Sequence, residues 1–280
     1  MTAFDDTLGR FRAAVAGPMS LVPLARPALL IAQAEYPGLD VEAYEERLHD
    51  LGAHLEARIH PSADVRTQLA EAHRLLFEEY GFHGNEDEYG DPKNLYLNDV
   101  MERRTGIPVT LAILYVEVCR TAGLDAHAVG LPGHVIVRVD SPEASVLVDP
   151  FNAGSELTEE QCRQLVRGVF GRRTPFREHF LEPVTSRQVT QRLLHNLKAG
   201  YLQRGDEERA GRAIEFLLAL FPWDLDEVRD RGMLRERVGD LPAALADLEE
   251  YVRYRAGARD IQTVNEAVRS LRRQTGAAER

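Results

Sequence analysis

Three residues with the chemistry needed for acyl transfer occur in a consistent order: Thr110, His134 and Asp149. A nucleophile, an imidazole base and a carboxylate that orients the base form the usual triad for this reaction. Each residue also has an ordinary structural explanation. Thr110 can cap a helix, His134 can lie in a core or at a strand edge, and Asp149 before Pro150 can begin a turn. The combination is more specific than any one residue alone.

The segment around Thr110 predicts a sharp turn that leads directly into a buried helix; residues 104–115 read RTGIPVTLAILY. Gly106 allows the turn, and Pro108 suits the first helical position, where its missing N–H would be unpaired in any case. Thr110 is then the third helical residue. In this first turn, free N–H groups and the helix dipole favour developing negative charge, so a nucleophile would be well placed there.

Three short β segments are expected after this helix, at 126–131, 135–140 and 145–149. Residues 141–144, Ser-Pro-Glu-Ala, predict the turn of a hairpin. His134 opens one strand and Asp149 ends the next, so an antiparallel hairpin would bring the two side chains together. A helix packed on a small antiparallel sheet indicates a mostly helical α+β fold.

The flanking regions are predicted to be helical. In residues 40–51, apolar residues recur at the 3, 4, 3 spacing of an amphipathic helix, and Ser62 or Asp64 can cap the helix that follows. From residue 187, GDEERA at 205–210 recurs as GDLPAA at 239–244. The offset, 239 − 205 = 34, is the period of a tetratricopeptide repeat.

We therefore expect three regions: an N-terminal helical region at 1–80, a core at 81–186 and helical repeats at 187–280, with a capping helix at 260–273. Two repeats are too few to be stable alone, so we expect them to pack on the rest of the chain.

Charge and composition exclude several classes of protein. The net charge of −11 argues against non-specific binding to nucleic acid and against docking on an anionic membrane. The apolar stretch at 18–34 is interrupted by Pro23, Arg26 and Pro27, so no membrane span is expected. The N-terminus lacks a signal pattern, and the two cysteines do not suggest a secreted scaffold. A cytoplasmic location is therefore expected.

No metal or cofactor is predicted. Acidic residues gather in the loop at 81–94, but counting Asn85 as the first calcium ligand puts Tyr89 at the fifth position and Tyr96 where the closing glutamate should be. A metal-dependent enzyme would need His134 and Asp149 together with His127 or His83. No pair of histidines or cysteines has the spacing of metal ligands, so this is the weakest of three hypotheses.

Residues 94–154 resemble the bacterial branch of the transglutaminase-like superfamily that carries tetratricopeptide repeats at its C-terminus. The motifs are NLYLN at 94–98, RRTGIPVTLA at 103–112, PGH at 132–134 and DPF at 149–151. The resemblance implies a papain-like core with a Cys-His-Asp triad. His134 and Asp149 match this triad, whereas Thr110 stands at the position of the cysteine. Members of this branch often carry Ser or Thr there.

A threonine hydroxyl is far less acidic than a thiol, and its methyl group hinders attack. The two cysteines cannot replace it. Cys119 lies nine residues after Thr110, on the opposite face of a helix that turns by about 100° per residue, and Cys162 lies in an expected surface helix.

The leading hypothesis is a non-catalytic or weakly active protein that binds a protein or peptide partner through its cleft and its repeats. The alternative is a hydrolase or acyltransferase that uses Thr110, His134 and Asp149 on amide or peptide bonds. Tyr96, Asn98 and Gly133 are expected to line the binding site, although Tyr96 and Asn98 can equally serve helix capping and packing. The sequence identifies neither the partner nor the oligomeric state.

Overall fold

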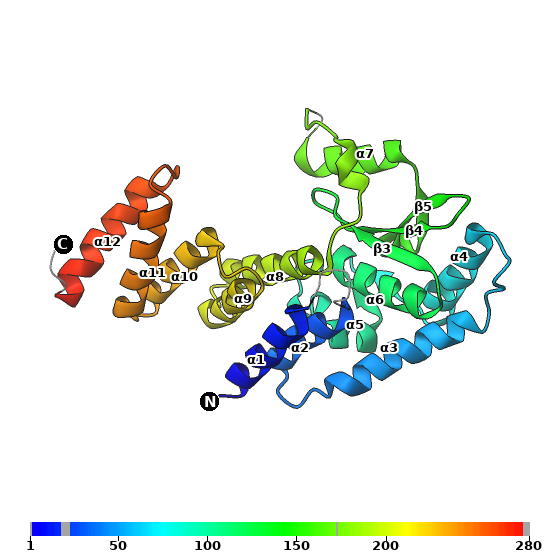
Figure 1. Ribbon diagram of the computed structural model, residues 1–280, viewed down its shortest axis with the longest axis horizontal. Coiled ribbons are helices and arrows are strands. Elements are labelled where there is room, and N and C mark those ends of the chain that lie inside the picture. Colours follow the sequence, from blue (N-terminus) through cyan, green and yellow to red (C-terminus); the bar gives the residue numbers. More distant parts are fainter. Residues whose placement is uncertain (1, 18–22, 172, 277–280) are drawn as a thin grey trace. The chain divides into compact units, whose positions relative to one another are not determined.

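Figure 1 shows the computed structural model of the protein, which describes residues 2–17, 23–171 and 173–276. The chain divides into two compact units, the first ending at Leu193 and the second beginning at Leu194. Its many helices and small sheet give the mostly helical α+β fold that the sequence predicts. The expected region boundaries at residues 80 and 186 stay a prediction.

The first unit begins with four helices and a π-helical turn: α1 (Ala3–Val15), α2 (Ala25–Glu35), α3 (Val41–Glu56), α4 (Val65–His73) and the turn Arg74–Glu79. The side chain of Asp40 caps α3 by accepting the N–H of Ala43, and Asp64 rather than Ser62 caps α4. The chain leaves the π turn through Gly81, whose φ of +73° favours glycine. Residues 18–22 of the interrupted apolar stretch lie outside the described residues.

The segment expected as a plain loop at 81–94 contains more structure than predicted. It holds strand β1 (His83–Gly84), which pairs in parallel with β2 (Thr105–Gly106), and a 3₁₀ turn at Pro92–Asn94. One of its acidic side chains, Asp91, forms an ion pair with Arg103 at 2.9 Å. The short helix α5 (Leu97–Arg103) follows.

Helix α6 (Pro108–Thr121) is the centre of the first unit. It begins at Pro108, so Thr110 is the third helical residue, as the sequence predicts. Every side chain from Pro108 to Val116 is buried, because protein surrounds this part of the helix.

A four-stranded antiparallel sheet lies beside α6, with its strands in chain order: β3 (Asp125–Val129), β4 (Ile136–Asp140), β5 (Ser145–Asp149) and β6 (Ser155–Leu157). The predicted hairpin is confirmed, because Val137 pairs with Val148 and Asp140 with Ser145. The first strand ends at Val129 rather than at residue 131, since the chain turns away through 130–133. Strand β6 was not expected from the sequence.

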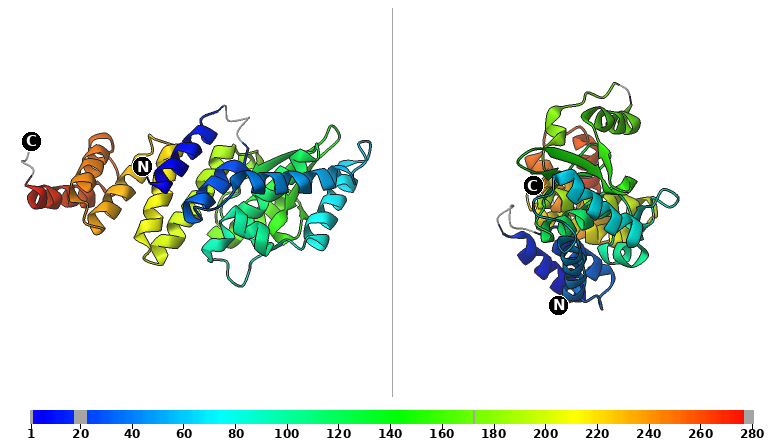
Figure 2. Two further views of the ribbon diagram at one scale, coloured as in Figure 1. Left: turned by 90° about the horizontal axis from the view of Figure 1, so that it is seen from below. Right: turned by 90° about the vertical axis from the view of Figure 1, so that its right-hand side faces the viewer.

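Both faces of this sheet are covered. Figures 1 and 2 show α7 (Glu159–Phe170) on one side and α6, α3 and α4 on the other. Alternation along the strands explains this: Ile136 of β4 packs with Cys162 and Val166 of α7, while Val137 and Val139 are buried towards the opposite face. Cys162 thus lies on the inner face of a helix whose other side is exposed.

After α7 and a 3₁₀ turn at Glu178–Leu181, the chain returns to the edge of the sheet. Val184 N donates to Ala128 O at 2.9 Å, next to a bridge between Val129 and Pro183. Helix α8 (Ser186–Gln203) begins here, and its first eight residues belong to the first unit. This connection places the start of α8 close to the loop that precedes His134.

The second unit continues with helical pairs: the remainder of α8, α9 (Glu207–Leu220), α10 (Leu225–Arg237), α11 (Leu241–Tyr254) and α12 (Ile261–Thr275). The predicted repeat appears in the backbone. Gly205 and Gly239 both have positive φ, of 71° and 86°, and Ala210 and Ala244 are both fully buried. These small residues allow helices to pack closely, as the repeat requires.

Packing within this unit is tight. A Cβ atom on Gly232 of α10 would lie 2.7 Å from Leu248 Cδ2 of α11, so these helices approach without room for a side chain. A buried ion cluster joins α8 to α10, because Lys198 Nζ lies 2.6 Å from Glu227 Oε2 and 2.5 Å from Asp230 Oδ2. Helix α12 corresponds to the expected capping helix.

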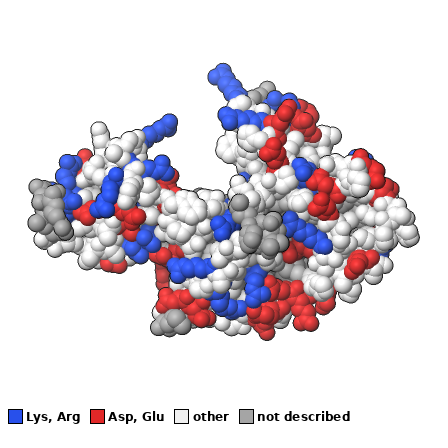
Figure 3. Space-filling model, viewed as in Figure 1, with Lys and Arg blue, Asp and Glu red and all other residues white. Residues whose placement is uncertain are grey.

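The described surface mixes both signs of charge. Figure 3 shows acidic and basic side chains interspersed over the face that it draws. None of the described helices combines the length and the apolar character needed to cross a membrane.

Candidate functional site

The hairpin of β4 and β5 brings His134 and Asp149 together. His134 Nε2 lies 2.9 Å from Asp149 Oδ2. Asp149 is fully buried, whereas the side chain of His134 keeps 12% of its surface exposed. The proximity expected from the sequence is therefore confirmed, although the catalytic role of the pair stays a prediction.

The Asp149 carboxylate is held by further donors from the 3₁₀ turn at Pro150–Asn152. Its Oδ1 accepts the N–H of Phe151 at 3.1 Å, and its Oδ2 accepts an amide proton from Asn152 Nδ2 at 2.7 Å. The sequence analysis did not single out Asn152. A carboxylate fixed in this way orients the imidazole, since Nε2 of His134 donates to it and Nδ1 becomes the nitrogen available as an acceptor.

Thr110 has a different environment. Its side chain is fully buried, and Oγ1 lies 2.7 Å from Asn94 O and 3.0 Å from Ile107 O. The same oxygen accepts the N–H of Ile107 at 3.2 Å. The hydroxyl proton is therefore directed to backbone carbonyls, and no hydrogen bond joins Thr110 to His134 among the described residues. Gly106 makes this arrangement possible, because a Cβ atom there would lie 2.9 Å from Oγ1.

Neither cysteine has the character of an activated nucleophile. Burial raises the pKa of Cys119 to about 12, and its neighbour Tyr115 only partly opposes this shift. Burial raises the pKa of Cys162 to about 11, with the charge of Asp149 adding to the shift. Both thiols are free and buried. The thiolate is the reactive form of cysteine, so both side chains serve packing.

The predicted binding residues lie in separate places. Tyr96 is buried at the start of α5, with its ring 5.7 Å from the ring of Tyr36. Asn98 is buried in the first turn of α5, and its Oδ1 has no hydrogen-bond partner in the described part of the chain. Gly133 directly precedes His134 and has φ of +80°. The binding roles of all three stay predictions.

Two aromatic side chains without a role in the sequence predictions, Phe151 and Tyr89, form a series of ring contacts that begins at His134. The ring of Phe151 meets the imidazole edge-to-face, with centroids 6.0 Å apart. Tyr89 meets Phe151 in the same manner at 6.1 Å and is half exposed. Phe151 belongs to the DPF motif next to Asp149, so the sequence could have identified it as a site residue. Tyr89 lies in a loop 62 residues earlier in the chain, and no local pattern links it to the site.

Comparison with known proteins identifies the family. A family model of the transglutaminase-like superfamily matches residues 42–195, and a tetratricopeptide-repeat model matches residues 197–269. The chain belongs to the transglutaminase-like superfamily. The resemblance stated from the motifs and the prediction of C-terminal repeats are both confirmed.

Bacterial relatives are similar over most of the chain. A UPF0162 protein of Xylella fastidiosa (strain Temecula1) is 36% identical over 82% of this chain and 83% of its own length. The UPF0162 protein YchA of Escherichia coli (strain K12) is 28% identical over 82% of this chain and 86% of its own length. The protein SirB1 of Salmonella typhimurium (strain LT2) is 30% identical over 66% of this chain and 69% of its own length.

One group of potential metal ligands occurs among the described residues of the transglutaminase-like core: Asp125, His127 and Asp140. His127 Nε2 lies 2.8 Å from Asp125 Oδ1, but Arg138 pairs with Asp140 at 2.8 Å. The positive charge of the Arg138 guanidinium beside Asp140 disfavours a bound cation. The group is therefore better described as a set of ion pairs on β3 and β4 than as a metal site. The metal hypothesis expected His127 or His83 beside His134; His83 instead contacts Thr105 Oγ1, at 3.1 Å.

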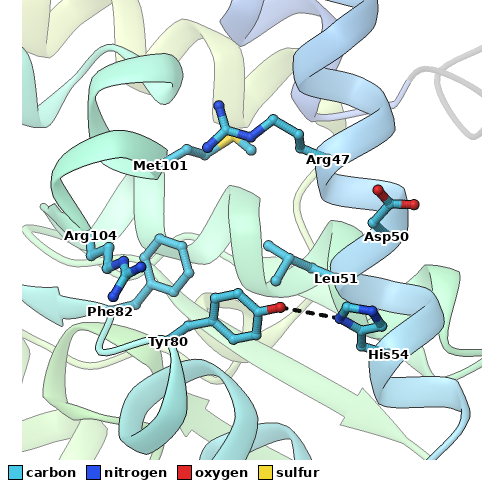
Figure 4. Close-up of a pocket in the computed structure, with 8 residues that line it drawn as sticks. All are labelled: Arg47, Asp50, Leu51, His54, Tyr80, Phe82, Met101 and Arg104. Carbon is cyan, nitrogen blue, oxygen red and sulfur yellow. Dashed lines mark hydrogen bonds between the residues drawn. The ribbon is translucent and has the colours of Figure 1, made fainter.

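A pocket of about 260 Å³ lies away from His134, between α3 and the end of α5. Figure 4 shows its polar and apolar lining, with the Tyr80 hydroxyl directed to His54 Nδ1 at 3.1 Å. Arg104 lines it from the end of α5, where its φ is +58°. None of the predicted site residues lines this pocket, so it is separate from the candidate site.

Proposed function

We propose that this chain is a protein-binding member of its superfamily, a pseudoenzyme with a papain-like core that is non-catalytic or weakly active. It would bind a protein or peptide partner at the surface around His134 and through its tetratricopeptide repeats. One observation carries the proposal: the hydroxyl of Thr110, at the nucleophile position, is buried and bonded to the carbonyl oxygens of Asn94 and Ile107.

The energetics of this hydroxyl favour a structural role. To attack a substrate, Thr110 would have to lose both carbonyl contacts and leave Asn94 O and the N–H of Ile107 without partners in a buried place. Each orphaned group costs roughly 1–3 kcal/mol, before any barrier to the chemistry. A threonine hydroxyl also lacks the low pKa of an activated thiol.

The repeats support binding as the function. Tetratricopeptide arrays present extended surfaces that bind peptides. The second unit exposes Trp223 and Tyr254, with 70% and 63% of their surface accessible. Tryptophan and tyrosine are the residue types that contribute most often to binding energy at interfaces. The two free cysteines agree with a reducing compartment, and the proposal includes a cytoplasmic location.

The test compares catalysis and binding in the same variants. A panel of peptide amides and esters is assayed for release of amine, ammonia or alcohol by the wild type, Thr110→Ala and His134→Ala. We expect no turnover that depends on both side chains. Turnover lost in both variants would refute the proposal. Binding of the protein or peptide partner is measured for further variants in parallel. Thr110→Ser should bind the partner as tightly as the wild type, whereas Trp223→Ala and Tyr254→Ala should bind it more weakly.

An acyl-transfer enzyme is the second candidate, and the geometry of His134, Asp149 and Asn152 favours it. We would replace Thr110 by Cys, with Cys119 and Cys162 replaced by Ala, and follow thiol alkylation against pH. A pKa well below roughly 8.5 that returns towards it in His134→Ala would support the enzyme. We expect the pKa of the introduced thiol not to be lowered and not to change in His134→Ala, because two carbonyl oxygens face this position and would disfavour a thiolate.

A further inference from the structure

Arg192 is a cation without a counter-ion at the edge of the candidate site. Its Nη1 donates to Leu131 O at 2.8 Å. No carboxylate lies within ion-pair distance of it among the residues that the structure describes. Burial lowers the pKa of this guanidinium, and Tyr89 is the one titratable group that acts in the opposite direction. An unpaired guanidinium that is largely removed from water is costly, so its position calls for an explanation.

The position of Arg192 is tied to that of His134. The same carbonyl, Leu131 O, also accepts the backbone N–H of His134 at 3.1 Å. The guanidinium of Arg192 and the backbone N–H of His134 therefore meet at one carbonyl of the turn at 131–134. The chain returns to the sheet edge at Val184, whose N–H donates to Ala128 O. Helix α8 begins two residues later, so Arg192 in its second turn lies beside the turn that precedes His134.

The aromatic side chains connect the same two groups. Burial raises the pKa of the Tyr89 hydroxyl, and the charge of Arg192 partly opposes this rise. Tyr89 contacts Phe151, and Phe151 contacts His134. The two rings and the imidazole thus form one series of contacts, and Arg192 binds a carbonyl of the turn that carries His134. Tyr89 is half exposed, so a ligand can approach from solvent.

A guanidinium has five N–H donors in a planar fork that matches a carboxylate, and the contact with Leu131 uses one nitrogen. We propose that Arg192 binds a carboxylate of the peptide partner beside His134, while Tyr89 and Phe151 contact the apolar part of the same segment. This inference rests on the proposed binding function and adds the chemistry of the partner: a peptide with a free C-terminus or an acidic side chain at this position.

A purely structural role for Arg192 is the competing explanation, and α8 offers a matched control. Arg187 lies on the same helix and donates from Nε and Nη2 to the backbone carbonyl of Val15. Like Arg192, it has a carbonyl partner and no described carboxylate partner. It does not contact the turn before His134. Arg187→Gln therefore measures the effect on ligand binding of removing a guanidinium that only anchors α8.

The experiment titrates three probes into the full chain and follows the His134 imidazole and the Arg side-chain resonances by NMR. The probes are N-acetylphenylalanine, its amide, and N-acetylglutamic acid α-amide. We expect a carboxylate probe to bind roughly tenfold or more tightly than N-acetylphenylalanine amide, since hydrogen bonds to a charged group contribute about that much. Which of the two acids binds distinguishes a C-terminal carboxylate from an acidic side chain.

The variants decide the role of the guanidinium. Arg192→Gln keeps a donor for Leu131 O and should reduce the preference for the acid to near unity. Arg192→Lys should retain part of it, because the charge remains and the fork is lost. Arg187→Gln should retain all of it. Amide dispersion in the NMR spectrum checks that each variant is folded, and Arg192→Lys keeps the test valid if Arg192→Gln is unstable.

Equal affinity for acid and amide, failure of all three probes to perturb His134, or an acid preference that survives in Arg192→Gln would overturn the inference. The proposed function fails in a different way. Release of ammonia from N-acetylphenylalanine amide that is lost in both Thr110→Ala and His134→Ala would refute the binding protein, whatever Arg192 contributes.

Discussion

Replacing Thr110 by Val and by Ser separates a structural hydroxyl from a catalytic one. Thr110→Val keeps the shape of the side chain but removes the donor to Asn94 O and the acceptor for the N–H of Ile107. Two buried polar groups lose their partner, at roughly 1–3 kcal/mol each, so we expect the free energy of unfolding to fall by about 2–6 kcal/mol. Thr110→Ser keeps the hydroxyl and loses one methyl group, at a cost of about 1 kcal/mol.

The assay is amide hydrogen exchange of α6 and of the segment 92–98, read by mass spectrometry, together with urea unfolding. The single tryptophan lies in the second unit and serves as an internal reference. Thr110→Val should accelerate exchange in the first unit far more than Thr110→Ser. If both variants exchange like the wild type, the hydroxyl has no structural role. In that case the hydroxyl would be free to act as a nucleophile, contrary to the proposed function.

Three further outcomes follow from the structure. Burial lowers the pKa of His73 below 6.5, so at this position the unfolded chain binds a proton more readily than the folded chain. The free energy of unfolding should therefore fall as the pH decreases from 6.5. In urea unfolding at several pH values, His73→Gln should show a weaker pH dependence than the wild type. Gly133→Ala should lower the free energy of unfolding by about 1–3 kcal/mol, because φ is +80° and the new Cβ would lie 2.8 Å from Val169 Cγ1. The control Gly168→Ala should not destabilise the chain, because no atom lies within 4 Å of its Cβ position. Lys198→Met removes the ammonium partner of the buried Glu227 carboxylate, which keeps only its contact with His195, at 3.3 Å. It should destabilise the second unit by about 1.5–3 kcal/mol, measured by tryptophan fluorescence.

Much of the fold follows from local sequence signals. Pro108 at a first helical position is a local constraint on φ and on hydrogen bonding, so the start of α6 and the place of Thr110 within it were predictable. The pairing of His134 with Asp149 was predictable because a short hairpin turn fixes the register of two adjacent strands. The repeats were predictable because their spacing is a periodic signal.

The chemical environment of Thr110 was not predictable in the same way. Its decisive partner, Asn94 O, lies sixteen residues earlier and belongs to a 3₁₀ turn that looked like plain loop. Arg192 and Tyr89 illustrate the same difficulty, since they join the site only through the packing of α8 and of a long loop. Such contacts depend on tertiary structure, which composition and periodicity do not encode directly.

The contrast between the two halves of the site bears on its use. Thr110, at the predicted nucleophile position, satisfies backbone groups that would otherwise be unpaired. The His134–Asp149 pair remains ordered, with Asn152 fixing the carboxylate and Nδ1 of the imidazole available as an acceptor. In the binding mode proposed above, the Arg192 guanidinium beside this imidazole binds a peptide carboxylate, and Tyr89 and Phe151 contact the rest of the segment, so no bond needs to be broken. The proposed binding function thus accounts for an ordered His134–Asp149 pair in the same unit as a threonine whose hydroxyl is bonded to the backbone.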